Sequence, residues 1–270
     1  MSVTTGKNWK VARYVTTTPY NIGGIPSTPE FSKHTEQTEE QGTGQRRLVN
    51  LHTTNIYWEI TWKMKLQRLA SFVNAYCMIT AEGDLSSCNL YMSDGVTERG
   101  WTGCLVDKCE VNIDQRGSIT ADITAFSNAN EAKSLSVTYE TEAPITKSGV
   151  SVLSVGGTAI TKWTNIRFGV SNNVAREPTG STDVVSEIFA RHPVYTGQIT
   201  LVKTAATPHY AFDTTKEKTV IITIVDNQGA PVTTTFTFTN AAVNVDRVHV
   251  AELGLTYEVI SWTGKQLTIS

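Results

Sequence analysis

Few side chains in this sequence combine residue type and spacing in a way that could support catalysis. The histidines are spread along the chain as His34, His52, His192, His209 and His249. None lies in a Gly-x-Ser-x-Gly, His-Glu-x-x-His or Walker motif, the contexts in which such side chains do chemistry. The neighbouring carboxylates of Glu39 and Glu40 could exchange protons with a substrate, but adjacent charges in a polar segment are usually solvated. We therefore expect no catalytic residues and no enzymatic activity.

Phosphate recognition is equally weak in the sequence. The segment from Gly42 to Arg47 is glycine-rich and basic, but it lacks the Lys-Ser/Thr step of a phosphate-binding loop. Arg46 and Arg47 form the nearest approach to a basic patch, and the net charge of the chain is −2. Because nucleic-acid binding depends on a surplus of basic side chains, these values exclude a protein whose main role is to grip DNA or RNA.

The four cysteines, Cys77, Cys88, Cys104 and Cys109, do not form a recognisable metal site. Cys104 and Cys109 are five residues apart, which would place them on opposite faces of a regular strand, and no histidine lies near them in the sequence. Without a secretory signal, we expect the cysteines to remain thiols. We expect no bound metal and no cofactor.

The six tryptophans are the side chains best suited to binding, because aromatic rings can stack on sugars or bases. Trp58 and Trp62 alternate with isoleucines, which favours burial, whereas Trp9 lies in a polar segment and is expected to anchor on a partner surface. A carbohydrate-binding β-sandwich module of a virion or cell surface, with Trp101 or Trp163 exposed, is therefore one alternative function.

The composition indicates a β protein. Thr, Val and Ile make up nearly a third of the 270 residues, and side chains branched at Cβ fit a pleated sheet better than a helix. The most apolar segment, Val220 to Val225, has only the length of a strand, and the N-terminus lacks the apolar core of a secretory signal. We expect a protein that is made in the cytosol, stays there and does not bind membranes.

Alternation of apolar and polar residues predicts most of the strands. Ile56, Trp58, Ile60, Trp62 and Met64 share one face of a strand from Thr54 to Met64. Hairpins are predicted at three turn sequences. These turns are Asp94-Gly95, Asp114 to Gly117 and Asp226 to Gly229, and further strands are expected at 165–170, 195–203, 245–253, 256–262 and 266–269.

Two segments depart from this alternation. Leu66, Leu69, Ala70, Val73 and Cys77 or Tyr76 recur at helical spacing, so one short helix is expected beside the sheet. Residues 1–47 are polar and show no sustained period, so they are expected to form an extended N-terminal arm or loop, with at most one strand at 10–16. Residues 48–270 then form the β domain.

In residues 50 to 270 the chain resembles the tail tube (major tail) proteins of long-tailed viruses. The resemblance rests on the order of several elements: Tyr57-Trp-Glu-Ile, a short helix, Trp101-Thr-Gly-Cys104, the strands Leu105–Ile113 and Ser118–Ala125, Val170-Ser-Asn-Asn173, Arg191-His-Pro193 before the strand Tyr195–Leu201, and a closing hairpin rich in Thr and Phe. Each motif alone is weak, and the order and spacing carry the match.

This resemblance implies a mainly β fold, a β-sandwich or half-barrel with one flanking helix, similar to the tube proteins of type VI secretion systems. It implies a structural virion protein that assembles in the host cytoplasm into stacked, usually hexameric rings. Sheets joined edge to edge would form one barrel around a channel for genome delivery. The implied partners are other copies of the chain, the tape measure, the tail terminator and, in a contractile tail, the sheath. Viral DNA would pass through without specific binding, and the N-terminal arm would contact a neighbouring subunit.

Overall fold

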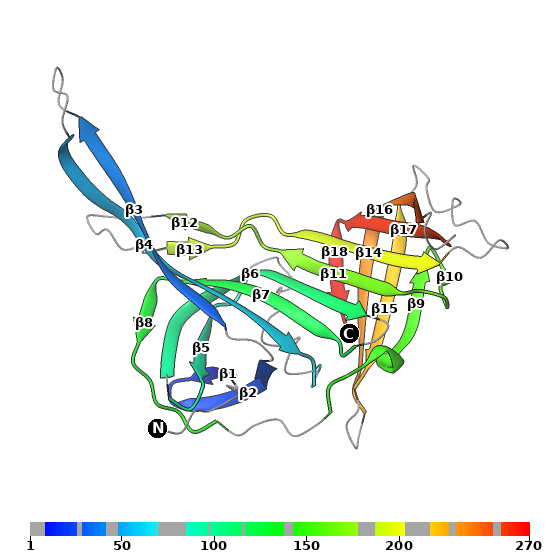
Figure 1. The fold of residues 1–270 in the computed structure, drawn as a ribbon, viewed down its shortest axis with the longest axis horizontal. Coiled ribbons are helices and arrows are strands. Elements are labelled where there is room, and N and C mark those ends of the chain that lie inside the picture. The colour runs from blue at the N-terminus through cyan, green and yellow to red at the C-terminus, as the bar shows by residue number, and fades with distance from the viewer. Residues whose placement is uncertain are drawn as a thin grey trace.

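The structure is a computed structural model that describes residues 9–25, 29–41, 48–67, 69, 85–96, 98–114, 117–137, 143–177, 187–202, 217–226, 231–250 and 255–270. Antiparallel strands dominate these ranges, so the prediction of a mainly β protein is confirmed. Nearly all of the strands join one large sheet that bends into three parts, and the two ends of this sheet do not meet within the described residues (Figure 1).

The central part, called here the central sheet, has the strand order β3-β4-β7-β6-β11-β14-β17-β16. All neighbouring strands in it are antiparallel. The bounds are Glu30–Gln41 (β3), Leu48–Lys65 (β4), Thr120–Ser127 (β7), Glu98–Asp114 (β6), Asn165–Ser171 (β11), Val194–Val202 (β14), Leu255–Gly264 (β17) and Thr233–Val250 (β16).

Two smaller flanking sheets continue from the central sheet, because β6 and β16 are long enough to run through two sheets each. The first flanking sheet contains β2 (Thr18–Ile25), β1 (Trp9–Val15), β5 (Cys88–Ser93), the start of β6 and β8 (Ala129–Glu131). The second contains β10 (Thr158–Ala159), β9 (Val150–Val155), β15 (Lys218–Val225), the start of β16 and β18 (Gln266–Ile269).

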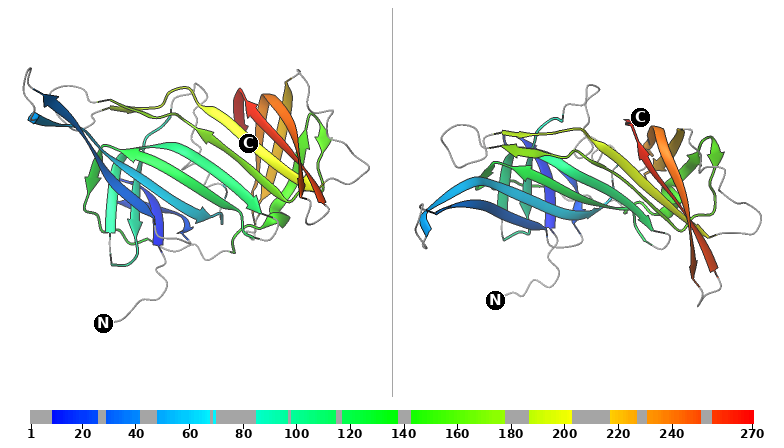
Figure 2. Two further views of the ribbon diagram at one scale, coloured as in Figure 1. Left: turned by 45° about the horizontal axis from the view of Figure 1, so that its top comes forward. Right: turned by 90° about the horizontal axis from the view of Figure 1, so that it is seen from above.

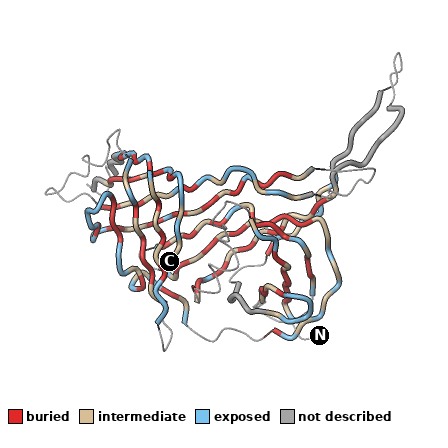
Figure 3. Tube along the Cα trace, turned by 180° about the vertical axis from the view of Figure 1, so that it is seen from behind, coloured by how far each residue is buried: buried red, intermediate tan, exposed pale blue. Residues whose placement is uncertain are grey.

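Both flanking sheets pack on the same face of the central sheet. Val111 of β6 lies opposite Phe168 of β11 in the register, so these buried side chains point to one face. Phe168 contacts the ring of Phe236 in the second flanking sheet at a centroid distance of 4.9 Å. In Figure 3 the buried residues follow the strands through both halves of the molecule. A single apolar core cluster therefore spans both halves.

Short elements connect the sheets. β12 (Ala175–Glu177) and β13 (Glu187–Phe189) pair with each other and extend the β11–β14 hairpin beyond the central sheet (Figure 1). A 3-10 turn spans Lys147–Gly149 before β9. The helix expected from Leu66 to Cys77 falls largely on residues 68 and 70–84, which lie outside the described residues, so that expectation remains a prediction.

The N-terminal residues differ from the sequence expectation. An irregular arm was expected over 1–47, but β1, β2 and β3 are regular strands, so that expectation is wrong for their residues. Trp9 and Val11 are buried in the core of their own chain, and Trp9 is therefore not left for a partner surface. β3 pairs with β4 across residue 47, the expected domain boundary. Two of these strands lack apolar alternation because β2 and β3 are bordered by a strand on one side only.

The cysteines also show a difference that the bulge in β6 explains. Cys104 and Cys109 were expected on opposite faces of one strand, yet both side chains are buried in the same core cluster. The register between β6 and β7 shifts between Val106 and Lys108, and this one-residue shift reverses the alternation. Cys88, Cys104 and Cys109 are thiols rather than disulfides, and burial raises the pKa of the Cys88 thiol to about 11.

The predicted hairpins are confirmed. Asp94-Gly95 joins β5 to β6, with Gly95 at φ 86° and the Asp94 carboxylate accepting a hydrogen bond from the Val96 amide. The other two turns join β6 to β7 and β15 to β16. One smaller expectation is wrong: a helical turn over 183–190 was predicted, and residues 187–189 form β13.

Candidate functional surface

The face of the central sheet that points away from the flanking sheets is broad and polar. Its side chains alternate along every strand with those that enter the core. We call it the polar face. It comprises Thr61, Lys63 and Lys65 of β4; Thr120, Asp122 and Thr124 of β7; Lys108, Glu110, Asn112 and Asp114 of β6; Asn165, Arg167, Gly169 and Ser171 of β11; Thr196, Gln198 and Thr200 of β14; Val259, Ser261 and Thr263 of β17; and Ala242, Asn244 and Asp246 of β16.

The polar face has a gradient in chemistry from one half to the other. Strands of the N-terminal half carry charged groups, whereas Thr196, Gln198, Ser261 and Thr263 in the C-terminal half are neutral. Threonine recurs in both halves, and its hydroxyl is solvated while its branched Cβ suits the strand. The excess of threonine in the composition is therefore partly explained by a sheet that is wet on one face.

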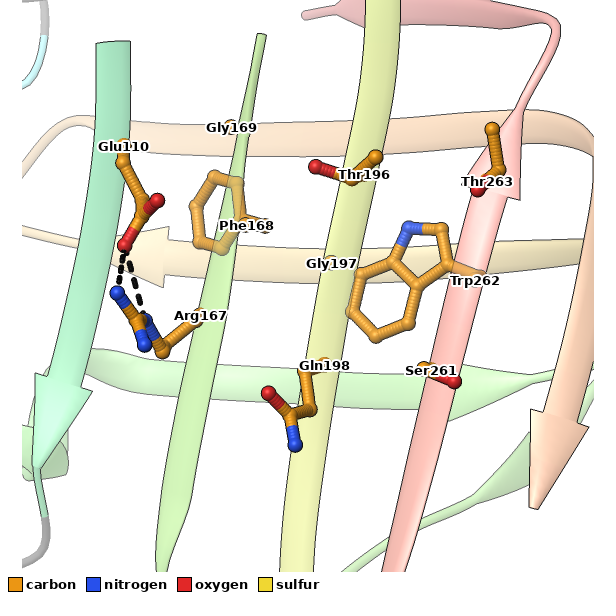
Figure 4. Close-up of a pocket in the computed structure, with 10 residues that line it drawn as sticks. All are labelled: Glu110, Arg167, Phe168, Gly169, Thr196, Gly197, Gln198, Ser261, Trp262 and Thr263. Carbon is orange, nitrogen blue, oxygen red and sulfur yellow. Dashed lines mark hydrogen bonds and ion pairs between the residues drawn. The ribbon is translucent and has the colours of Figure 1, made fainter. Parts of the chain in front are cut away.

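Basic groups on the polar face lie beside acidic ones. Lys63 Nζ lies 3.5 Å from an Asp122 oxygen across the β4–β7 pair. Lys108 Nζ lies 3.3 Å from Glu110, two residues further along β6. Arg167 on β11 donates through Nε to Glu110 at 2.9 Å and also through a terminal nitrogen (Figure 4). Pairing of this kind reduces the attraction of the surface for phosphate groups, because each cation already has an anionic neighbour.

Glu110 is the electrostatic centre of this group. Its partial burial disfavours the charged carboxylate, but the hydrogen bond and positive charge of Arg167 outweigh this effect, and Lys108 adds a smaller contribution. The net result lowers the pKa of Glu110 below its ordinary value. A carboxylate with a lowered pKa stabilises the folded state above the pKa of the unfolded chain, and this contribution is lost as the pH falls through the folded-state pKa.

We predict a pH-dependent effect for Glu110→Gln. At neutral pH the variant should be less stable than the unmodified protein by up to about 1 kcal/mol, the usual range for a pair exposed to solvent. Below the pKa of an unfolded glutamate, about 4.3, the difference should shrink as the native carboxyl is protonated. Urea unfolding at several pH values measures this, with Lys65→Gln on the same face as the control. A stability difference that grows on acidification would contradict the prediction.

A shallow depression lies on the polar face where β11 has no side chain. Gly169 sits between Glu110 on β6 and Thr196 on β14 in the register. The surrounding residues include Arg167, Gln198 and Ser261 (Figure 4). A Cβ on Gly169 would meet the Glu110 Cα at 3.0 Å, so close approach of β6 and β11 accounts for the glycine. The depression is lined by hydrogen-bonding groups and has no nucleophile beside a base.

One end of the polar face is closed by a small apolar cluster. Tyr57 and Phe126 contact each other edge to face at a centroid distance of 5.9 Å, and the Arg176 guanidinium of β12 lies over both rings at 4.5 and 4.3 Å. His34 of β3 stacks on Tyr57 at 4.9 Å. β12 therefore covers the sheet at this end, and the exposed polar surface begins beyond it.

The other candidate residues do not form a site. Trp101 and Trp163 are 0% and 7% exposed, so neither ring offers the open platform that sugar binding requires. Of the histidines, His34 lies beside Glu59 at 3.0 Å and His192 is exposed, and their neighbourhoods supply no catalytic group. The side chains of Glu39, Glu40, Arg46, Arg47, His52, His209 and His249 lie outside the described part.

Two further classes of site can be addressed for the described ranges. Among those residues, no group of three or more His, Cys, Asp or Glu side chains is placed to hold a metal ion. Within the same ranges, none of the helical segments has the length and hydropathy needed to span a lipid bilayer. The polar face, which sequence reasoning did not localise, is thus the main functional candidate; the alternation along β4, β7 and β17 was the signal for it.

Comparison with known proteins was made for the sequence. A family model described as phage tail tube protein matches residues 14–259. The match therefore includes the central sheet and most of both flanking sheets, and it begins within β1. None of the curated proteins that were compared with the chain matches it.

Proposed function

Because the chain belongs to the phage tail tube protein family, we propose that it polymerises into stacked rings with six positions around a central channel, and that this tube is the conduit for genome delivery. Membership in the family makes the protein a structural component of the virion tail. The finer features of the assembly are part of the proposal. They are supported by the open central sheet and by its polar face.

The polar face is proposed to line the channel. A channel wall must remain hydrated and must not retain the phosphates of passing DNA. Hydroxyl and amide groups such as Thr196 and Gln198 meet the first need, and the acidic neighbours of Lys63, Lys108 and Arg167 meet the second. The net charge of −2 agrees with this role, because it gives no long-range attraction for nucleic acid.

Ring formation is supported by the two open edges of the central sheet. Within the described residues, β3 pairs only with β4, and the second half of β16 pairs only with β17. Open edges in a monomer tend to pair with other chains, and heterologous contacts related by rotation close into a ring. The bound partners are proposed to be other copies of the chain, with the tape measure, tail terminator and, in a contractile tail, the sheath as further tail partners. Synthesis and assembly are proposed to occur in the host cytoplasm.

Negative-stain electron microscopy of the purified protein tests this function. The expected images show rings with a central hole, or tubes, that become more frequent as the protein concentration rises. Sedimentation velocity on the same samples should show a large species in exchange with smaller ones. A protein that stays monomeric at high concentration, and under conditions that favour assembly of tails, would contradict the proposal.

A further inference from the structure

The chain contains the same arrangement of strands twice. In residues 9–131, the β1–β2 hairpin borders β5, β3 pairs with β4, and β5, β6 and β7 follow as a meander, with β8 returning to β6. In residues 150–269, the β9–β10 hairpin borders β15, β11 pairs with β14, and β15, β16 and β17 follow, with β18 returning to β16. The order of pairing is the same in both copies (Figure 2).

The spacing between the copies is constant along most of the strands. Phe31 pairs with Ile60 in the first copy, and Phe168 pairs with Gly197 in the second. Both members of the second pair lie 137 residues after those of the first. The same interval relates two further pairs, Trp101 with Asn130 and Phe238 with Leu267. A fixed interval over several strands indicates two copies of one structural unit rather than a chance likeness between sheets.

Local irregularities recur at matching places. The β5–β6 register shifts between Cys88 and Leu90, and the β15–β16 register shifts between Lys218 and Val220. Each shift lies two residues inside the hairpin strand that borders the long strand's bend. Bulges interrupt hydrogen bonding and are conserved parts of a design, so their recurrence supports duplication.

The long strands bend at equivalent residues with left-handed backbone. Gly103 in β6 has φ 63°, and Asn240 in β16, 137 residues later, has φ 50°. Glycine and asparagine are the residues that adopt this conformation most readily. Each bend directs its strand from a flanking sheet into the central sheet, so the two units are built around the same backbone device.

The two copies lie side by side in the central sheet. β6 is the edge of the first copy and β11 is the edge of the second, and they pair from Lys108–Ser171 to Asp114–Asn165. This pairing, the internal joint, includes Glu110 opposite Gly169. The equivalent strands at the outer edges are β16 and β3, which have no neighbour on their outer sides within the described residues.

We propose that β16 of one chain pairs with β3 of the next in the register of the internal joint, so that each chain fills two adjacent positions of the ring. Asp246 then lies opposite Ser32 of the neighbouring chain, as Glu110 lies opposite Gly169 within one chain. Six positions are filled by three chains. The inference rests on the proposed function, because it describes how the proposed ring closes, and the partner is a second copy of this chain.

Exposure of the matched phenylalanines supports a missing strand beside β3. Phe168 is 3% exposed, and β6 lies next to its strand. Phe31 occupies the matching position on β3 and contacts Trp101 at a centroid distance of 5.5 Å, much as Phe168 contacts Phe238 at 6.0 Å. Phe31 is nevertheless only partly buried. Pairing of β3 with the next chain would cover it.

The joint between chains differs in charge from the internal joint. Arg167 and Glu110 form an ion pair across the internal joint. The matching residues are Glu30 on β3 and Asp246 on β16, which are both acidic and both exposed. Like charges across neighbouring strands weaken pairing. The joint between chains is therefore weaker than the internal joint, and Glu30→Arg is expected to lower the protein concentration at which rings form.

Disulfide cross-linking tests the register and the number of chains together. The variant carries Ser32→Cys and Asp246→Cys, which the register places directly opposite each other between chains. Directly opposite residues have Cβ atoms about 4.5–5.5 Å apart, close enough for a disulfide after small adjustment. A matched control combines Ser32→Cys with Ala242→Cys, which is offset by four residues, about 13 Å along the strand. Each single variant and the unmodified protein control for the native cysteines.

After mild oxidation of assembled protein, we expect covalent species of two and three chains, with the ladder ending at three. The offset control and the single variants should give no ladder beyond that of the unmodified protein. Intact rings with a ladder that continues to six chains, rings that the matched pair does not cross-link, or equal cross-linking of the offset pair would each overturn the inference and leave the proposed function standing. Absence of rings in micrographs of the unmodified protein would overturn the proposed function and the inference with it.

Discussion

Replacing Gly197 with isoleucine is expected to destabilise the protein by about 3 kcal/mol, at the upper end of the usual cost of overpacking a core. Gly197 lies opposite Trp262 across the β14–β17 pair, and the indole ring lies over the glycine (Figure 4). A Cβ added to Gly197 would overlap Cζ2 of that ring. Trp262 cannot swing away freely, because it also contacts Phe238 at a centroid distance of 5.6 Å.

The same replacement is expected to stabilise a variant that already carries Trp262→Ala. That variant alone should lose about 3–5 kcal/mol because it leaves a cavity over Gly197. The equivalent pair in the first copy is Ile60 opposite Ala125, so the large and small side chains are exchanged between strands. Gly197→Ile with Trp262→Ala reproduces that pair, and the coupling between the two sites should be about 1–3 kcal/mol.

Urea unfolding of the four proteins in this cycle measures the coupling. Combining Gly197→Ile with Trp101→Ala, a large-to-small change in the first flanking sheet, serves as the control and should be close to additive. If Gly197→Ile destabilises the Trp262→Ala variant as much as it destabilises the unmodified protein, then the exchange of volume between the copies is not the reason for the glycine.

Removing the outer part of the β3–β4 hairpin is expected to abolish long tubes while leaving a folded protein. Beyond the pair Thr35–Ile56, these strands continue to Gln41–Leu48 and project from the body of the molecule (Figure 1). β4 pairs with β7 only from Trp58 to Lys65, so the projecting part contributes no described strand pairing to the central sheet. We propose that it takes the role expected of the N-terminal arm, which is contact with a subunit of the adjacent ring.

The variant replaces residues 36–54 with Asn-Gly, a sequence suited to a two-residue hairpin turn. Circular dichroism should report an unchanged sheet signal, and negative-stain microscopy should show rings without long tubes. A scrambled hairpin of the original length is the control for the length of the projection. Tubes of normal length from the shortened protein would rule out the hairpin as the stacking element.

Local patterns in the sequence predicted much of the fold. Asp94-Gly95 indicated a hairpin because a turn residue with positive φ sits between two alternating runs, and the structure has that turn. Alternation along Ile60, Trp62 and Met64 correctly placed those side chains in the core. Signals of this kind depend only on neighbouring residues, so they remain visible in one sequence.

Other features depend on contacts between distant residues and were not visible. β3 carries a run of polar side chains, and only its pairing with β4 makes it a strand. The bulge near Asp107 brings Cys104 and Cys109 to one face, and the Asp107 carboxylate that accepts from the Val174 amide at 2.7 Å lies 67 residues from its donor. The duplication was hidden because matched core positions, such as Ile60 and Gly197, exchange volume with their partners.

The polar face was only partly predictable. Outward positions such as Asn112, Thr120 and Asp122 follow from alternation, but their meeting with Arg167 and Gln198 requires the β6–β11 joint, which links the two copies. The sequence could indicate that threonines wet one face of a sheet. It could not assign those threonines to one continuous surface, because the order of strands in the sheet differs from their order in the chain.

A cryo-EM map of the assembled protein tests the central claim, that the polar face lines the channel of a tube. The account predicts a continuous barrel in which Thr196, Gln198 and Thr263 point toward the axis and the flanking sheets lie outside. A tube whose channel is lined by the flanking sheets, with the polar face turned outward or buried between subunits, would contradict it.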